Sequence, residues 1–157
     1  MNRRFLMLAP VAALLAACAT TQQPATVADT IARNPDLSTL NSLVQKAGLA
    51  ETLKAAGPYT VFAPTNEAFK AVPAKTMNEL AADPARLKKV LTYHVLPMKV
   101  TAHDVKPGNV KTAEGANLAL ARAGDFVTVD EAMVQKADIM ATNGVVHMVD
   151  RVLMPPR

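Results

Sequence analysis

The sequence has few of the residues that disulfide, thiol and aromatic chemistry require. It contains one cysteine, which excludes an internal disulfide, a cysteine-based zinc site and a CxxC redox centre. It has no tryptophan, two tyrosines and four phenylalanines, which argues against a base-stacking platform for single-stranded nucleic acid. The single cysteine therefore excludes disulfide-stapled and CxxC redox proteins, and the few aromatic residues disfavour the binding of single-stranded nucleic acid by stacking as the function.

Groups for catalysis are also scarce. The chain has two serines, Ser38 and Ser42, and neither lies in a G-x-S-x-G elbow. The three histidines lack HxH and HExxH spacings, and no phosphate-binding glycine loop or evident pair of acid–base carboxylates is present. We therefore expect no enzymatic activity, no metal site and no cofactor.

The remaining composition is that of a globular protein. With 157 residues, 50% of them hydrophobic and 19% charged, the chain is sized for one folded domain. The formal charge of +4 includes a small basic cluster of Arg86, Lys88 and Lys89. We expect this cluster to be the solvated face of a helix.

The first eighteen residues have the pattern of an export signal. Met1–Arg4 is basic, and Phe5–Ala17 is uncharged and shorter than the ~20 apolar residues that a membrane-spanning helix needs. The segment Leu15–Cys18 resembles the lipobox of bacterial lipoproteins. That resemblance implies cleavage before Cys18 and attachment of lipid to its sulfur. The alternative is an ordinary signal peptide with a cysteine there by chance.

This signal divides the chain into three parts. Residues 1–17 are the expected lipoprotein signal peptide, 18–26 a lipidated polar tether and 27–157 a single domain. Cleavage removes two arginines and lowers the formal charge from +4 to +2, so we expect no nucleic-acid partner. Ala19, in place of an aspartate after the cysteine, resembles lipoproteins sent to the outer membrane. We expect an exported protein, anchored by lipid in the bacterial cell envelope.

The first half of the domain is predicted to be mainly helical. Apolar residues recur at helical spacing, and glycines and prolines mark the ends. Four of the predicted helices cover residues 27–33, 49–56, 76–82 and 84–91. A further helix is predicted to be capped by Asp36 or Ser38 and to end at Gly48, and another to be capped by residues 65–67. A strand is predicted over Tyr59–Ala63, with Pro64 ending it.

The second half changes to strand-like alternation. The predicted strands are Asn117–Arg122, Phe126–Val129, Ala132–Gln135, Asp138–Ala141 and Val145–Leu153. Asn143 and Gly144 are predicted to form a two-residue hairpin turn. Helices followed by mainly antiparallel strands predict an α+β fold rather than a parallel βαβ sheet.

Two segments of this chain resemble the signatures of the fasciclin domain. Residues 60–69, Thr-Val-Phe-Ala-Pro-Thr-Asn-Glu-Ala-Phe, resemble the first signature, and residues 143–155, beginning Asn-Gly-Val-Val-His, resemble the second. Between them, Leu91–Val95 resembles the central Tyr-His segment of the family. The resemblance extends over residues 27–155, nearly all of the predicted domain.

The resemblance implies a fold and a type of function. The fold is a wedge of mainly antiparallel strands with a cluster of short helices, and the function is extracellular adhesion or protein–protein contact without catalysis. We expect the signature residues to be structural, because they fill a strand, end it, cap a helix or turn the chain. These residues are Thr60, Val61, Phe62, Ala63, Pro64, Asn66, Phe69, Asn143, Gly144 and His147.

The histidines have both a chemical and a structural interpretation. His94, beside Tyr93, is either a base, ligand or pH switch, or a buried imidazole bonded to the backbone next to a packed tyrosine ring. We expect the structural role but keep Tyr93 and His94 as candidate interaction residues. His147 is expected to be semi-buried with a bonded partner, and His103 to be exposed or a cap.

Asp138 and Ile139 are the second candidate interaction site. In animal fasciclin domains, an Asp-Ile pair shortly before the second signature is associated with integrin-dependent adhesion, and these residues resemble it. The alternative is that Ile139 belongs to the core and Asp138 to a turn.

The sequence therefore predicts a non-catalytic adhesion or protein-interaction module. Its expected partners are the membrane, through the lipid, and an unknown protein or extracellular-matrix polymer, and the domain is expected to be monomeric. The alternative is an envelope module that binds a small molecule or cofactor in a pocket near Tyr93 and His94.

Overall fold

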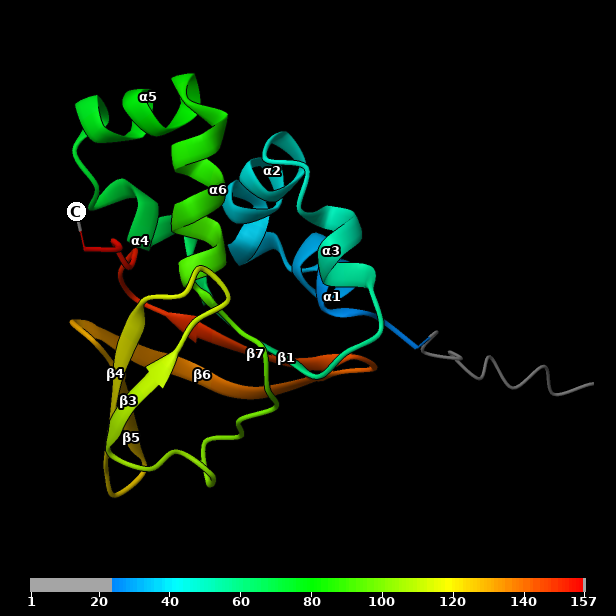
Figure 1. The fold of residues 1–157 in the computed structure, drawn as a ribbon, viewed down its shortest axis with the longest axis vertical. Coiled ribbons are helices and arrows are strands. Elements are labelled where there is room, and N and C mark those ends of the chain that lie inside the picture. Colours follow the sequence, from blue (N-terminus) through cyan, green and yellow to red (C-terminus); the bar gives the residue numbers. More distant parts are fainter. Residues whose placement is uncertain (1–23, 157) are drawn as a thin grey trace, which may run out of the picture.

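The computed structural model describes residues 24–156. Within them, a group of helices lies over one part of a twisted seven-stranded sheet (Figure 1). The predicted signal peptide, the predicted lipidation site Cys18 and most of the predicted tether lie outside the described residues.

The elements follow the predicted α+β pattern. The helical elements are α1 (Val27–Arg33), the 3-10 helix η1 (Pro35–Leu37), α2 (Ser38–Lys46), α3 (Ala50–Lys54), α4 (Asn66–Lys70), α5 (Ala74–Ala82) and α6 (Pro84–Tyr93). The strands are β1 (Tyr59–Pro64), β2 (Val95–Leu96), β3 (Gly108–Lys111), β4 (Asn117–Ala123), β5 (Phe126–Val129), β6 (Ala132–Ala141) and β7 (Gly144–Val149).

Side-chain caps decide where several helices begin. The Thr65 hydroxyl accepts a hydrogen bond from the Ala68 amide at 3.3 Å and starts α4, as predicted. The Asp83 carboxylate caps α6 with Pro84 at its first position, also as predicted. These contacts are local in sequence, which is why the sequence predicts both helices well.

The predicted cap of the second helix is wrong. Asp36 does not cap it, and Ser38 is already the first residue of α2, which has no side-chain cap. The cap belongs to Asn34, whose Oδ1 accepts from the Asp36 amide at 3.0 Å and starts η1. Pro35 follows at the first helical position, so the chain turns helical one turn earlier than predicted.

The sheet places the two signature segments side by side. Its strand order is β2-β1-β7-β6-β5-β4-β3. Strands β1 and β7 are parallel, with Phe62 opposite His147, and every other neighbouring pair is antiparallel. A parallel pair near one edge of a mainly antiparallel sheet is a long-range feature that the alternation pattern did not predict.

Two hydrophobic clusters cover opposite faces of β1 and β7. Val61, Ala63 and Val146 belong to a cluster with the helices, whereas Phe62 and Val149 belong to a cluster inside the curved outer part of the sheet. Strands β1 and β7 are therefore buried on both faces. This burial explains their almost continuous apolar sequences.

Several of the predicted strands differ from those in the structure. The two short strands predicted within residues 132–141 are the single long strand β6, whose alternation is interrupted by irregularities on both sides of Lys136. The last predicted strand ends at Val149 rather than Leu153. The prediction also omits β2 and β3, which have two and four residues and are too short to show a period.

The predicted Asn-Gly hairpin turn is displaced by one residue. Thr142 and Asn143 occupy the turn, and Gly144 is already paired with Ala141 in the sheet. Neither Asn143 nor Gly144 has the positive φ that a type I′ turn requires. The dihedral angles of a type I′ turn are therefore not the reason for either residue.

The last residues of the predicted tether contact the domain. The Ala25 carbonyl accepts a hydrogen bond from the Thr142 amide at 2.9 Å. The Thr26 hydroxyl caps α1, and the Asp29 carboxylate bonds back to the Thr26 amide at 3.1 Å. The ordered contacts thus begin before residue 27.

Candidate functional site

Asn143 joins three segments at the start of β7. Its Oδ1 accepts from the Val27 amide of α1 at 2.8 Å, and its Nδ2 donates to the carbonyls of Leu53 and Ala55 at 2.7 and 2.9 Å. Its own carbonyl accepts from the Tyr59 amide at 3.0 Å. The side chain thus satisfies backbone groups at the ends of α1 and α3, a role that needs both an amide donor and an amide acceptor.

Gly144 begins β7 and lies directly against the backbone of β1. A Cβ atom added there would lie 1.9 Å from the Tyr59 carbonyl oxygen and 2.8 Å from its carbonyl carbon. The glycine is therefore required by the contact between two parallel strands rather than by a turn.

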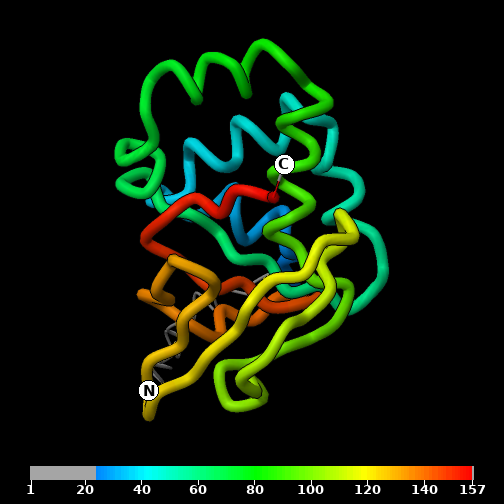
Figure 2. Tube along the Cα trace, turned by 60° about the vertical axis from the view of Figure 1, so that its left-hand side comes forward, coloured from blue at the N-terminus to red at the C-terminus, as the bar shows by residue number. Residues whose placement is uncertain are grey.

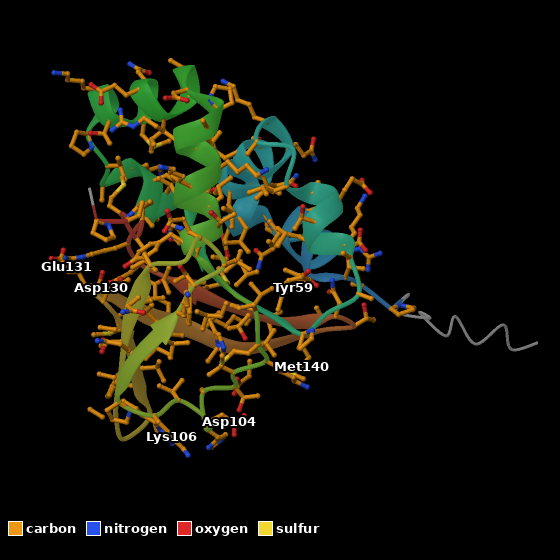
Figure 3. The ribbon with its side chains drawn as sticks, in the orientation of Figure 1. Tyr59, Asp104, Lys106, Asp130, Glu131 and Met140 are labelled. Atoms are coloured by element: carbon orange, nitrogen blue, oxygen red, sulfur yellow. The ribbon has the colours of Figure 1, made fainter. Side chains whose placement is uncertain are left out.

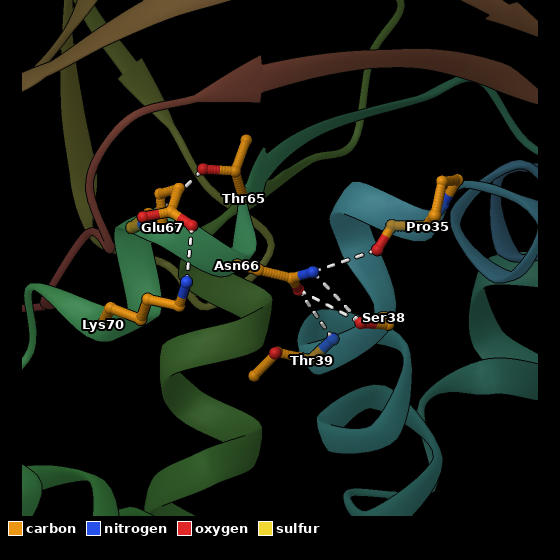
Figure 4. A network of polar contacts seen from close by, with 8 residues as sticks. Pro35, Ser38, Thr39, Thr65, Asn66, Glu67 and Lys70 are labelled. Carbon is orange, nitrogen blue, oxygen red and sulfur yellow. Dashed lines mark hydrogen bonds and ion pairs between the residues drawn. The ribbon is translucent and has the colours of Figure 1, made fainter.

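Asn66 performs a similar task at the start of α4 (Figure 4). Its Nδ2 donates to the Pro35 carbonyl at 3.0 Å and to the Ser38 hydroxyl at 3.1 Å, while its Oδ1 accepts from the Thr39 amide at 3.0 Å. This signature residue therefore connects the helix after β1 to the beginning of α2.

His94 is a buried structural contact at the end of α6. Its Nδ1 lies 2.7 Å from the Val90 carbonyl, and its Nε2 accepts from the Leu153 amide at 2.9 Å. An Nδ1-protonated neutral ring satisfies both contacts. Burial lowers the pKa of His94 from 6.5 to about 4, so the imidazole is neutral near pH 7.

Tyr93 and His94 present almost no surface to a ligand. Each is 2% exposed, and the Tyr93 hydroxyl donates to the Asn117 carbonyl at 3.2 Å. Burial, followed by the nearby Asp130 charge, raises the pKa of the Tyr93 phenol. The structure thus brings the two residues together inside the protein, and the expected pocket does not open onto either side chain.

His147 lies beneath the loop that connects β2 to β3. It is 2% exposed and stacks on Phe62 with ring centroids 5.6 Å apart. Its Nε2 donates to the Val100 carbonyl at 2.7 Å, and its Nδ1 accepts from the Asp138 amide at 3.1 Å. Burial lowers the pKa of His147, which favours the neutral ring that these two contacts require.

Asp138 and Ile139 also contribute to internal contacts. The Asp138 backbone has a φ of 56°, and its Oδ1 accepts from the Ala102 amide at 2.8 Å. Ile139 is half-buried and packs against the helical cluster. The neighbouring Met140 is 55% exposed and lies on the surface (Figure 3).

Thr60, expected only to belong to a strand, also holds the loop after β2. It is fully buried, and its hydroxyl donates to the Met98 carbonyl at 2.7 Å and accepts from the Val100 amide at 2.8 Å. Thr60, His147 and Asp138 together hold the loop after β2. No local sequence signal could reveal this, because the partners are 36 to 47 residues apart along the chain.

The polar groups inside the domain are fully used in holding the fold. In residues 24–156, no buried side-chain nitrogen or oxygen lacks a hydrogen-bond partner. That part of the chain also contains no group of three or more His, Cys, Asp or Glu residues placed to bind a metal ion. None of the helices it contains has the length and apolar character needed to cross a bilayer.

Comparisons with known proteins support the family resemblance of the two signature segments. Residues 35–155 match the Fasciclin domain family. Protein sll1483 of Synechocystis sp. is 44% identical over 140 residues, which cover 88% of this chain and 78% of that protein. The ig-h3 protein of Sus scrofa, named transforming growth factor-beta-induced, is 42% identical over 132 residues, which cover 83% of this chain but 19% of that longer protein.

Two further matches involve a bacterial surface protein and a solved structure. The cell surface glycolipoprotein MPB83 of Mycobacterium bovis is 38% identical over 135 residues, covering 83% of this chain and 60% of that protein. A FAS1 domain pair from the insect cell adhesion molecule fasciclin I superposes with a TM-score of 0.63 at 21% identity, covering 77% of this chain and 46% of the solved chain. Since the family match includes both signature segments and the parallel strands that they form, the chain belongs to the fasciclin domain family.

Proposed function

We propose that this chain is a cell-envelope lipoprotein whose fasciclin domain mediates adhesion or protein–protein interaction without catalysis. The observation that carries the proposal is the internal use of the signature residues. Asn66, Asn143 and His147 hold backbone segments together, and Gly144 permits two strands to approach. With these residues committed to the fold, a partner must be recognised by the outer surface.

Relatives support an envelope location for this proposal. The Mycobacterium bovis protein, 38% identical over 135 residues, is named a cell surface glycolipoprotein. The lipobox-like segment that ends at Cys18 fits the same arrangement. Ala19 favours the outer membrane where a cell has two membranes.

We place the contact with a protein or matrix partner around Met140. This residue is 55% exposed, adjoins Asp138 and Ile139, and lies on the surface of the sheet (Figure 3). The Asp138 carboxylate is bonded to the Ala102 amide, so it shapes this surface rather than projecting freely from it. The alternative of a ligand pocket at Tyr93 and His94 is disfavoured, because both side chains are 2% exposed.

A photo-crosslinker at Met140 tests the adhesive role. We expect irradiation of intact cells to give a discrete adduct, because Met140 directly follows Ile139 of the candidate interaction pair and its side chain is 55% exposed. The matched control is Phe126, which is 64% exposed at the turn between β4 and β5. Adduct mass is read by immunoblotting and mass spectrometry. The absence of a reproducible adduct from Met140, or the same adducts from both positions, would contradict this contact.

Replacing Cys18 by serine tests the lipid anchor. Serine lacks the thiolate needed for the thioether, so Cys18→Ser is expected to abolish incorporation of labelled fatty acid and move the protein from the membrane to the soluble fraction. Ser42→Ala, a substitution on the exposed side of α2, is the control and should remain acylated. Membrane retention of unlabelled Cys18→Ser protein would reject the anchor while leaving the family membership intact.

A further inference from the structure

A groove lies between the helices α4–α6 and the segment that follows β7. It has a volume of about 720 Å³, within the range of roughly 300–1,000 Å³ that is usual for small-molecule sites. The C-terminal segment runs from the sheet toward these helices (Figure 2) and forms one wall. Apolar side chains from both sides line the groove, including Val72, Leu80, Val90, Val152 and Met154.

Positive charge surrounds this apolar lining. Three cations, Arg86, Lys89 and Arg151, face one carboxylate, Glu79. Glu79 is already paired with Arg86 at 3.7 Å. Within residues 24–156, Lys89 and Arg151 have no ion-pair partner within 4.0 Å. The groove therefore has an excess of positive charge available to an anion.

Buried contacts fix the two walls relative to each other. His94 lies behind the groove, where its ring bonds both the Val90 carbonyl of α6 and the Leu153 amide of the C-terminal segment. Leu153 is 3% exposed and is packed in the core. The groove is thus part of the folded structure rather than a gap beside a loosely attached terminus.

The lining indicates which kind of ligand fits. Among the described residues that line the groove, none is aromatic, so a flat ring has no stacking partner. Thr76 is the single uncharged polar residue of that lining, which is too few for a sugar with many hydroxyl groups. Valine, leucine, methionine and proline side chains instead suit a flexible aliphatic chain.

We propose that this groove binds the free carboxylate form of an aliphatic acid, such as a fatty acid, as a single molecule. The chain lies on the floor made by α5, α6 and Val152, and the carboxylate lies near Lys89 and Arg151. This site is separate from the adhesive contact around Met140, so each can fail without the other.

Titration with dodecanoate tests the site on the full chain. Isothermal titration calorimetry below the micelle concentration is expected to show saturable one-to-one binding. Dodecanol should bind at least about tenfold more weakly, because it has the same chain without the charge. Acetate should give no measurable heat, because it has the charge without the chain.

Adjacent lysines of α6 provide a matched pair of variants. Lys89 lines the groove, whereas Lys88 is exposed on the same helix and does not. We expect Lys89→Glu to weaken dodecanoate binding by about tenfold or more, and Lys88→Glu by less than about twofold. Ala71→Phe, which adds a ring to an exposed lining position, should abolish binding while circular dichroism stays unchanged.

Several results would overturn the proposal. These are equal effects of Lys88→Glu and Lys89→Glu, dodecanol binding as tightly as dodecanoate, and retained affinity in a folded Ala71→Phe protein. Binding to phosphatidylglycerol vesicles without binding to monomeric dodecanoate would also overturn it, because the anion would then be a membrane surface rather than a free acid. Every variant retains the same N-terminal segment, so binding by that segment would not distinguish Lys88 from Lys89.

Discussion

Gly144→Ala is expected to prevent the domain from folding stably. The added Cβ would lie 1.9 Å from the Tyr59 carbonyl oxygen, 2.8 Å from its carbonyl carbon and 3.0 Å from its amide nitrogen. Backbone atoms cannot rotate away as a flexible side chain can, and β1 and β7 are held in register from Tyr59–Gly144 to Pro64–Val149. We expect a loss above ~4 kcal/mol, a large part of the 5–15 kcal/mol that is usual for a domain.

Urea unfolding followed by far-ultraviolet circular dichroism measures this effect. Gly124→Ala is the control, because Gly124 has a φ of +62° but no atom within 4 Å of an added Cβ. It should lose only about 1–2 kcal/mol from the left-handed backbone. A Gly144→Ala protein as stable as the Gly124→Ala protein would show that β7 can move away from β1 and that the close contact is not required.

Acid is expected to destabilise the domain through His94. In the unfolded chain this imidazole takes up a proton near its ordinary pKa of 6.5, whereas the folded protein holds it neutral down to a pKa of about 4. Between these values the unfolded state binds more protons, so the free energy of unfolding falls as the pH falls. The loss from His94 is expected to reach about 3 kcal/mol at pH 4. The lowered pKa of His147 acts in the same direction.

The His94→Gln variant separates this effect from general acid denaturation. Glutamine keeps a donor and an acceptor but does not titrate, so the variant should be less stable at pH 7 and lose less stability on acidification. The slope of the free energy of unfolding against pH measures how many more protons the unfolded state binds than the folded state. Between pH 4 and 6.5 we expect this number to decrease by up to about one in the variant. An unchanged slope would show that His94 is not the responsible group. His103→Gln, at an exposed site, should retain the stability of the unchanged protein at pH 7.

Local chemistry explains which elements could be predicted. The helix α1 and the strand β5 have the predicted bounds, and Thr65 and Asp83 cap the helices they were expected to cap. Each of these features depends on residues within about one turn or one strand of each other. The same reasoning fails in β6, where irregularities near Lys136 break the alternation on which strand prediction depends.

The roles of the signature residues likewise depend on contacts that are distant in the sequence. Asn143, Gly144 and His147 were recognised as signature residues from the sequence, but Asn143 and Gly144 were predicted to form a turn. Asn143 bonds to backbone groups of Val27, Leu53 and Ala55, which precede it by 88 to 116 residues in the sequence. Gly144 is required by its contact with Tyr59 of β1. The basic residues of α6 were expected to be a solvated face, but Arg86 and Lys89 also border a groove closed by residues 151–156.

The sequence by itself determined the α+β class, most helices and the fasciclin signatures, because caps, periodicity and short motifs act over a few neighbouring residues. Only the tertiary structure decided the parallel pairing of β1 and β7, the steric need for Gly144 and the neutral buried state of His94. It also decided that Lys89 and Arg151 border one groove. These features depend on contacts between distant segments, and a local pattern does not specify which segment will provide the opposing atom.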